Sequence, residues 1–282
     1  MPRPSPKALA LLLLALLAPP VLADEALAPV DPSETTRDTT MRESPTWDEI
    51  RGDVVGEGTI LDGADLFTLD APFRAEDAAI VPIRLTQKPG TPEIIRLTLV
   101  VDENPSPVVA VFTFGPAMHP LDLETRIRVN AYSNVRAIAE TADGTLRMTG
   151  RFVRAAGGCS APASKDAAAA LAALGQMKTR WYGAEPAASG MEREAQIMLR
   201  HPNYSGLQRN QVTHLFVPAR FIDRMEVSQG DTELFRMEGG ISISEDPTFR
   251  FRYLDTGSGE PLSVRAHDTD GVEFEGNFPP GT

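Results

Sequence analysis

Short runs of β-branched and other apolar residues, separated by turn residues, recur from one end of the chain to the other. Runs of this length, bounded by Pro, Gly, Asn and Asp, predict β-strands. In the first half we expect strands at 80–85, 94–101, 108–114, 125–132, 135–139 and 146–153. About seven short strands at this spacing indicate an antiparallel sandwich of immunoglobulin size, roughly 100 residues.

The strand pattern stops at residue 155 and resumes at residue 195. Small residues fill 155–163, a helix is predicted from Ser164 through Lys178 with Gly175 as a weak point, and a second small-residue linker covers 184–190. The later strands are expected at 195–200, 212–217, 221–227, 233–237, 241–243, 249–253, 262–266 and 272–275. The sequence therefore predicts an all-β chain: two immunoglobulin-like β-sandwiches joined by a linker with one short helix.

The N-terminus is typical of a secretory signal peptide. Arg3 and Lys7 precede an apolar run at 8–18, and small residues lead to an expected cleavage site after Ala23. We therefore expect a periplasmic protein whose residues 24–45, which are polar and rich in Pro and Thr, form a flexible leader. No later run approaches the ~20 apolar residues of a spanning helix, so no membrane span is expected.

Charge and motif content exclude several classes of function. With 39 acidic and 27 basic residues the formal net charge is −12, which disfavours nucleic acid as a partner. The four histidines lack the spacing of a metal site, and no phosphate-binding loop, dinucleotide fingerprint or nucleophile elbow occurs. We expect no metal, no cofactor and no catalytic constellation of the chain's own. His201 is expected to be a structural histidine rather than part of a thiol pocket.

The chain has one cysteine, Cys159, preceded by Gly157 and Gly158 and followed by Ser160. An unpaired cysteine in an exported protein indicates either an intermolecular partner or a free reactive thiol. Glycines permit unusual backbone angles and remove bulk, so we expect a mobile, open arm that presents the thiol. Cations at 151, 154 and 165 are expected to favour the thiolate. The alternative is a cysteine buried as a small apolar residue.

Several segments resemble the SoxY and SoxZ families of the periplasmic sulfur-oxidation carrier. The SoxY-like segments are Val81-Pro82-Ile83, 102–107, 126–129 and Gly157-Gly158-Cys159, and the SoxZ-like segments are 201–206, 217–222 and 239–247. The resemblance spans about residues 47–278 on one chain. It is closest to the fused SoxYZ-like carriers associated with quinoprotein (PQQ-dependent) alcohol dehydrogenases.

The resemblance implies a SoxY-like sandwich at 46–157, a cysteine-bearing linker and helix at 158–190, and a SoxZ-like sandwich at 191–282, packed on each other. It implies that Cys159 carries sulfur compounds as covalent adducts on an arm formed with Gly157, Gly158 and Ser160. The implied partners are c-type cytochromes or a quinoprotein dehydrogenase. Ser160 and Ala161 replace the family's second glycine pair, and the arm continues into the second domain, so its reach is shorter than that of a free tail.

Two hypotheses about function follow. The first is a periplasmic thiol carrier that binds its cargo at Cys159. The second is a non-covalent accessory protein for a PQQ-dependent alcohol dehydrogenase or its cytochrome, guided by the acidic surface. A third hypothesis, that the chain itself catalyses a hydrolysis, is not supported by any catalytic group of residues in the sequence.

Overall fold

The computed structural model describes residues 38–162, 167–183, 190–211 and 213–280. Residues 38–282 belong to one compact unit. The predicted signal peptide and most of the predicted leader lie outside the described residues. So do the expected start of the linker helix at Ser164, Lys165, and residues 184–189 of the second linker.

The first half, residues 38–162, begins with one helix and continues as strands. Helix α2 covers Pro45–Val55, and the strands are β1 (Ile60–Asp62), β2 (Phe67–Asp70), β3 (Val81–Gln87), β4 (Ile94–Val101), β5 (Val108–Phe114), β6 (Asp122–Ile127), β7 (Ser133–Thr141) and β8 (Leu146–Val153). A single 3-10 turn, η1 (Pro116–Met118), follows β5.

The second half, residues 167–280, begins with the short helix α3 (Ala167–Ala172). Its strands are β9 (Met177–Tyr182), β10 (Glu192–Leu199), β11 (Ile222–Gln229), β12 (Thr232–Gly239), β13 (Thr248–Leu254), β14 (Leu262–Asp268) and β15 (Glu273–Phe278). The predicted all-β fold class, with one short helix between two sandwich halves, is confirmed.

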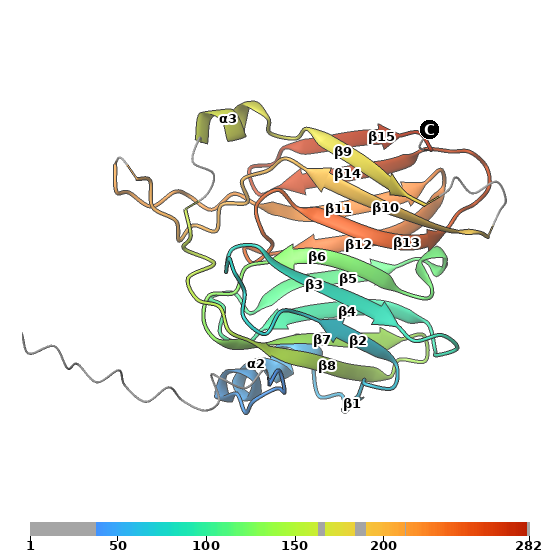
Figure 1. Cartoon of the computed structure of the whole chain (residues 1–282), viewed down its shortest axis with the longest axis horizontal. Coiled ribbons are helices and arrows are strands. Elements are labelled where there is room, and N and C mark those ends of the chain that lie inside the picture. The colour runs from blue at the N-terminus through green and yellow to red at the C-terminus, as the bar shows by residue number, and fades with distance from the viewer. Residues whose placement is uncertain (1–37, 163–166, 184–189, 212, 281–282) are drawn as a thin grey trace, which may run out of the picture. The chain divides into compact units, whose positions relative to one another are not determined.

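The two halves share both sheets of the sandwich. Among the described residues, one sheet has nine strands in the order β1-β8-β7-β4-β5-β12-β11-β14-β15, and the other has six in the order β2-β3-β6-β13-β10-β9. The junction is antiparallel in both layers, where β5 pairs with β12 and β6 pairs with β13. Figure 1 shows the strands of the first half continuing edge to edge into those of the second.

One hydrophobic core runs through this junction. Phe112 of the first half lies 6.3 Å from Phe235 and 6.1 Å from Phe249 of the second, measured between ring centroids. All three rings are fully buried. Because alternate residues of each strand face this core, β3 shows alternation of buried with more exposed positions.

Helix α2 lies against the first half. The Ser44 side chain accepts a hydrogen bond from the Trp47 amide (3.2 Å), Pro45 occupies the first turn, and Gly56 ends the helix at φ 68°. The buried Trp47 side chain packs with Val100 and Ile138. Residues 38–45 also contact the sandwich, because the Phe152 amide donates to the carbonyl of Thr39 (2.9 Å). The flexible leader predicted up to residue 45 is therefore wrong for residues 38–45.

Four predicted elements differ from the structure. The run expected as a strand at 241–243 is a turn, in which Ile243 makes one isolated bridge with Ile127. The linker helix ends at Ala172 instead of Lys178, because Gly175 turns with φ 79° and β9 follows. Within the described residues, the strand expected at 212–217 is a loop that makes one isolated bridge, Arg209 to Phe216. The strand expected at 125–132 ends at Ile127, where the Arg128 amide donates to the carbonyl of Ser242 in the second half.

Candidate functional site

Cys159 lies in a tight turn that follows β8, at the junction of the two halves. We call residues 157–160 the cysteine turn. The amide of Gly157 donates to Asn130 (2.8 Å), and that of Gly158 donates to Val129 (3.1 Å). The Cys159 side chain has no exposed surface. The open, mobile presentation expected for Cys159 is therefore wrong for this structure, in which backbone hydrogen bonds hold the cysteine turn against the sandwich.

The two glycines permit this docking. Gly157 has φ 80°, a left-handed conformation that favours glycine. At Gly158 an added Cβ would lie 2.1 Å from the Ala78 carbonyl oxygen and 2.6 Å from that of Val129. Gly157 therefore permits the turn and Gly158 permits close packing, whereas the sequence suggested a mobile segment. Ser160 is exposed, and its hydroxyl donates to the carbonyl of Gly157 (3.3 Å).

The second half covers the cysteine turn from the loop between β10 and β11. The buried Ser205 hydroxyl donates a hydrogen bond to the carbonyl of Cys159. Ser205 is itself held by Gln208, whose Oε1 accepts from the Ser205 amide (2.8 Å). Cys159 is thus enclosed by elements of both halves.

A buried arginine lies beside the cysteine turn. Arg128 is 1% exposed, and its Nη1 donates to the carbonyl of Gly158 (3.1 Å) while its Nη2 donates to that of Asn203 (3.3 Å). Within the described part of the chain, Arg128 forms no ion pair, and its buried Nε has no hydrogen-bond partner. The guanidinium therefore joins the cysteine turn to the second half.

The surroundings of Cys159 oppose ionisation of the thiol. Burial raises the pKa of the Cys159 thiol, and the charge of Arg128 and a hydrogen bond with the Ser242 side chain oppose this increase. Burial lowers the pKa of Arg128, against the fields of Glu245, Cys159 and Asp77. Because the thiolate is the nucleophile, the docked cysteine is held in its unreactive form.

The cations expected from the sequence to assist Cys159 have other contacts. Arg151 donates to the carbonyl of Leu69 (2.6 Å) and to the hydroxyl of Thr39 (2.8 Å). The Arg154 guanidinium lies 4.3 Å from the ring centre of Phe73. The structure therefore does not support the expectation that residues 151 and 154 favour the thiolate. The cation whose charge acts on the Cys159 thiol is Arg128. Strand alternation would put Arg128 on the exposed face with Arg126, but β6 ends between them.

His201 is a structural histidine, as expected. It is buried, with Nδ1 2.8 Å from Asn203 Oδ1 and Nε2 3.4 Å from Asp268 Oδ2. Burial lowers the pKa of His201, and hydrogen bonds with Asp268 and Asn203 oppose this. These contacts fix Asn203, whose carbonyl accepts from Arg128.

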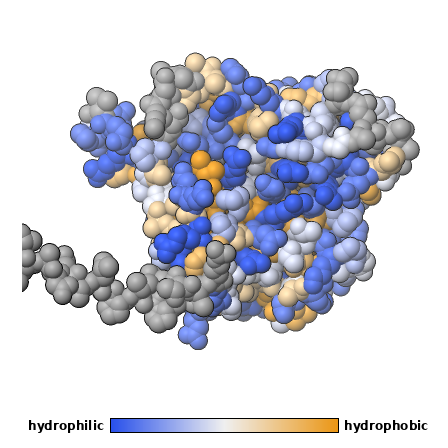
Figure 2. Space-filling view, viewed as in Figure 1, coloured by the Kyte–Doolittle hydropathy of each residue, from blue (hydrophilic) through white to orange (hydrophobic). Residues whose placement is uncertain are grey.

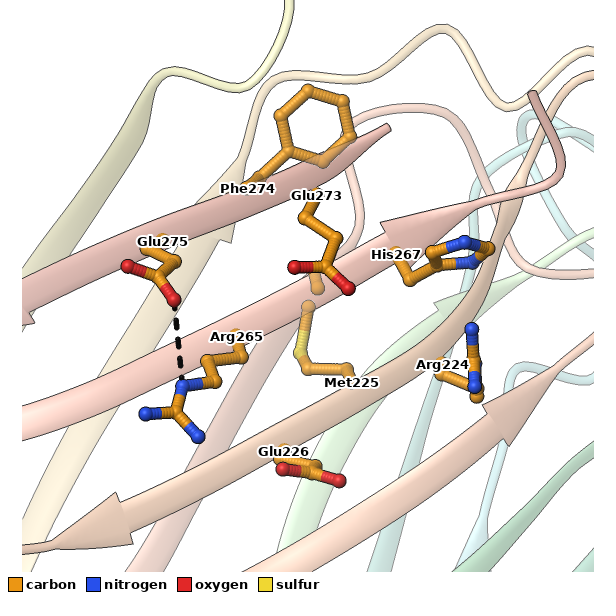
Figure 3. A pocket seen from close by; sticks show the side chains of 9 residues that line it. Arg224, Met225, Glu226, Arg265, His267, Glu273, Phe274 and Glu275 are labelled. Atoms are coloured by element: carbon orange, nitrogen blue, oxygen red, sulfur yellow. Dashed lines mark ion pairs between the residues drawn. The ribbon is translucent and has the colours of Figure 1, made fainter. Parts of the chain in front are cut away.

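A separate pocket of about 310 Å³ lies on β11, β14 and β15, and Figure 3 shows its lining. Its charged residues are of both signs and partly paired: Arg265 lies 3.5 Å from Glu275, and His267 lies 2.7 Å from Asp223. None of the elements around Cys159 contributes to this pocket. It offers no group that acts on the thiol.

The described residues contain no group of three or more His, Cys, Asp or Glu side chains placed to hold a metal ion. No helix among them has the length and apolar character needed to cross a membrane.

Comparison with known proteins identifies the two halves. No curated protein sequence matches the chain. A solved superoxide reductase (neelaredoxin) from Ignicoccus hospitalis is similar at 14% identity and a TM-score of 0.29, over 40% of this chain and 92% of that chain, a likeness too small to carry an argument. The family model for sulfur oxidation protein SoxY matches residues 51–159, and that for sulphur oxidation protein SoxZ matches residues 182–279. The chain is therefore a fused SoxYZ-like protein, in which a SoxY domain is followed by a SoxZ domain.

Proposed function

We propose that this chain is a periplasmic thiol carrier of sulfur compounds, which binds its cargo covalently at Cys159 and presents it to redox partners. The SoxY and SoxZ domains support a carrier role in sulfur oxidation. The observation that carries the finer proposal is that the SoxY match ends on Cys159, the only cysteine of the sequence. The arm residues in this proposal are Gly157, Gly158 and Ser160.

The chemistry requires an oxidising partner. Loading joins the Cys159 thiolate to a second compound with a thiolate-type sulfur, and forms one S–S bond. The two electrons released pass one at a time to haem groups of redox proteins such as c-type cytochromes, and the thiol proton passes to water. Reduction of the same bond by a thiol donor returns the electron pair and restores the Cys159 thiol.

The structure described above corresponds, in this proposal, to the resting state of the carrier. The thiol is buried, and its pKa is raised by that burial, so a reaction with a partner requires the cysteine turn to leave its site. The contacts that must break are the hydrogen bonds from Ser205 to Cys159 and from Arg128 to Gly158, together with the backbone hydrogen bonds that the amides of Gly157 and Gly158 donate. All of them are noncovalent, so the opening is reversible in this proposal.

The test is the intact mass of the protein isolated from the native periplasm, before and after reduction. A mass increment that is removed by reductant and missing from Cys159→Ala supports a covalent carrier. An increment that persists in Cys159→Ala contradicts it. Sequencing the N-terminus of the same material tests the predicted cleavage after Ala23, for which the expected first residue is Asp24.

A second candidate is favoured by the complete burial of Cys159 and by the net charge of −12. In this alternative the chain is a non-covalent accessory protein for a PQQ-dependent alcohol dehydrogenase or its cytochrome. It predicts that Cys159 resists alkylation until the protein unfolds, and that the chain co-purifies with the dehydrogenase at low salt but not at high salt. Alkylation of the folded protein together with a failure to co-purify would contradict it.

A further inference from the structure

The loop between β10 and β11 forms a long hairpin that extends beyond the sheets (Figure 1). We call residues 204–211 and 213–220 the covering hairpin. Its backbone hydrogen bonds run from base to tip: the amide of Arg220 donates to Tyr204 (2.9 Å), that of Val217 to Gln208 (2.9 Å), and that of Asn210 to Leu215 (2.9 Å). The described part of the hairpin is therefore a connected element rather than a loose loop.

The tip of the covering hairpin exposes two large apolar side chains. Leu215 is 69% exposed and Phe216 is 59% exposed, the largest values among the exposed large apolar residues described. The Arg209 guanidinium lies 4.6 Å from the ring centre of Phe216, so one face of the ring is covered by a cation. On the face shown in Figure 2, hydrophilic and hydrophobic residues are interspersed. Two adjacent apolar side chains at a projecting tip are accessible to another protein.

The covering hairpin also differs from the rest of the chain in charge. The sequence from Tyr204 to Ile222 contains no Asp or Glu, although the whole chain has 39 acidic residues and a net charge of −12. Arg220 is engaged at the base by Asp268 (2.8 Å). Arg209 is exposed at the tip beside Phe216. The chemistry of the tip is therefore apolar and cationic, and the surface that complements it is apolar and bordered by carboxylates.

The base of the same hairpin holds Cys159. Ser205 donates to the Cys159 carbonyl, and Gln208 fixes Ser205 through both its amide (2.8 Å) and its hydroxyl (3.1 Å). The buried Nε2 of Gln208 has no hydrogen-bond partner within the described residues. One continuous element therefore connects an exposed tip with the contact that closes the cysteine turn.

We propose that the covering hairpin is the docking element for the redox protein that loads Cys159, and that this partner receives Leu215 and Phe216 in an apolar site bordered by carboxylates. This inference rests on the proposed carrier function. In this proposal the partner contacts the hairpin whose base holds Ser205, and displacement of Ser205 releases the Cys159 carbonyl. Partner recognition and thiol release are then carried by the same hairpin.

The test compares the loading of variants in the native host. Wild type, Phe216→Ser and the control Leu61→Ser, which changes an apolar residue 45% exposed on β1, each replace the chromosomal copy. The reducible adduct on each purified protein is measured by intact mass over time after sulfur substrate is supplied. Because buried aromatic anchors dominate interface energies, we expect Phe216→Ser to load about tenfold more slowly than both others.

Further measurements separate docking from damage to the fold. The alkylation rate of reduced Cys159 in vitro and the urea midpoint are expected to be equal in Phe216→Ser and Leu61→Ser. Arg209→Glu is expected to slow loading, whereas Arg209→Lys and the control Arg236→Glu are not. Equal loading of Phe216→Ser and wild type would overturn the docking proposal and leave the carrier function standing. If wild type itself acquires no adduct, the carrier function and the docking proposal are both rejected.

Discussion

The hydroxyl of Ser205 donates a hydrogen bond to the backbone carbonyl of Cys159, so a residue of the SoxZ domain closes the cysteine turn of the SoxY domain. Both groups are buried, and no other side chain of the described residues donates to this carbonyl. The contact therefore contributes directly to the balance between docked and released cysteine. Removing this hydrogen bond changes the ratio of docked to released cysteine turn without altering the thiol itself.

Ser205→Ala is expected to increase the alkylation rate of Cys159 in the folded protein. A neutral buried hydrogen bond contributes about 0.5–1.5 kcal/mol, which corresponds to a roughly two- to tenfold higher population of the released turn. Iodoacetamide labelling followed by mass spectrometry measures the rate. Ser258→Ala, in an exposed turn, is the control and is expected to leave it unchanged. Equal rates in the two variants would show that Ser205 does not hold the turn.

Substitution of the two glycines is expected to have unequal effects. Gly158→Ala places a Cβ 2.1 Å from the Ala78 carbonyl oxygen, so the cysteine turn must leave its site and Cys159 becomes readily alkylated. Gly157→Ala meets no atom within 4 Å and costs only the left-handed conformation, about 1–2 kcal/mol. Labelling rates and urea midpoints of both variants check this order. A reversed order would contradict the docked geometry.

Arg128→Met is expected to destabilise the fold and to raise the thiol pKa further. The variant leaves the carbonyls of Gly158 and Asn203 without their charged donor, and hydrogen bonds to charged groups contribute about 1.5–3 kcal/mol each. It also removes the positive charge that opposes the raised pKa of Cys159. Arg126→Met, two residues earlier and exposed, is the matched control. Urea denaturation of both variants, with the pH dependence of labelling, is the measurement.

The stability of the protein is expected to depend on pH through Cys159. Burial raises the pKa of the thiol in the folded state, so above the ordinary thiol pKa of about 8.5 the unfolded chain loses this proton before the folded one. The unfolding free energy of wild type relative to Cys159→Ala is therefore constant below that pH and falls as the pH increases above it. Urea titrations at several pH values measure the difference. A difference that grows with pH would contradict a buried neutral thiol.

The two halves are expected to unfold together. The sequence has two tryptophans, and each reports on one half: Trp47 on α2 and Trp181 on β9. In Trp47→Phe the remaining tryptophan fluorescence reports on the second half, and in Trp181→Phe it reports on the first. Because Phe112 and Phe235 lie in one core across the junction, the urea midpoints from fluorescence and from circular dichroism are expected to coincide within each variant. Two separate transitions would show that the halves are energetically independent.

Much of the fold follows from local sequence patterns. The alternation at Val81–Gln87 and the Asp-Gly pairs at 143–144 and 270–271 predict strands and hairpins that the structure contains. The joining of the halves does not follow from such patterns, because β5 and β12 are distant in sequence and alternation does not reveal which edges pair. The covering hairpin looked like a strand at 212–217 because its apolar tip residues resemble a core-facing run.

The candidate site was only partly predictable. A lone cysteine beside two glycines singles out Cys159 in the sequence. In the structure Gly158 permits close packing and Gly157 adopts a left-handed conformation, whereas the sequence suggested a mobile arm. The burial of Cys159 depends on Ser205 and Arg128, which approach it from other elements. Nothing in the spacing of the sequence places them there. Long-range contacts of this kind are set by tertiary packing, which local patterns do not encode.

The shared sheets have a consequence for synthesis. The first half is synthesised before the second. The edge of β5 at which Val111 later pairs with Glu238 stays open until residues 232–239 are made, and the edge of β6 at which Glu124 later pairs with Arg250 stays open until residues 248–254 are made. Open strand edges of this kind pair readily with other chains. Because both domains lie on one polypeptide, every first half is followed by its own β12 and β13. The two domains are therefore made in a ratio of one to one. Fusion thus ensures that the strands which cover these two edges are supplied by the same chain.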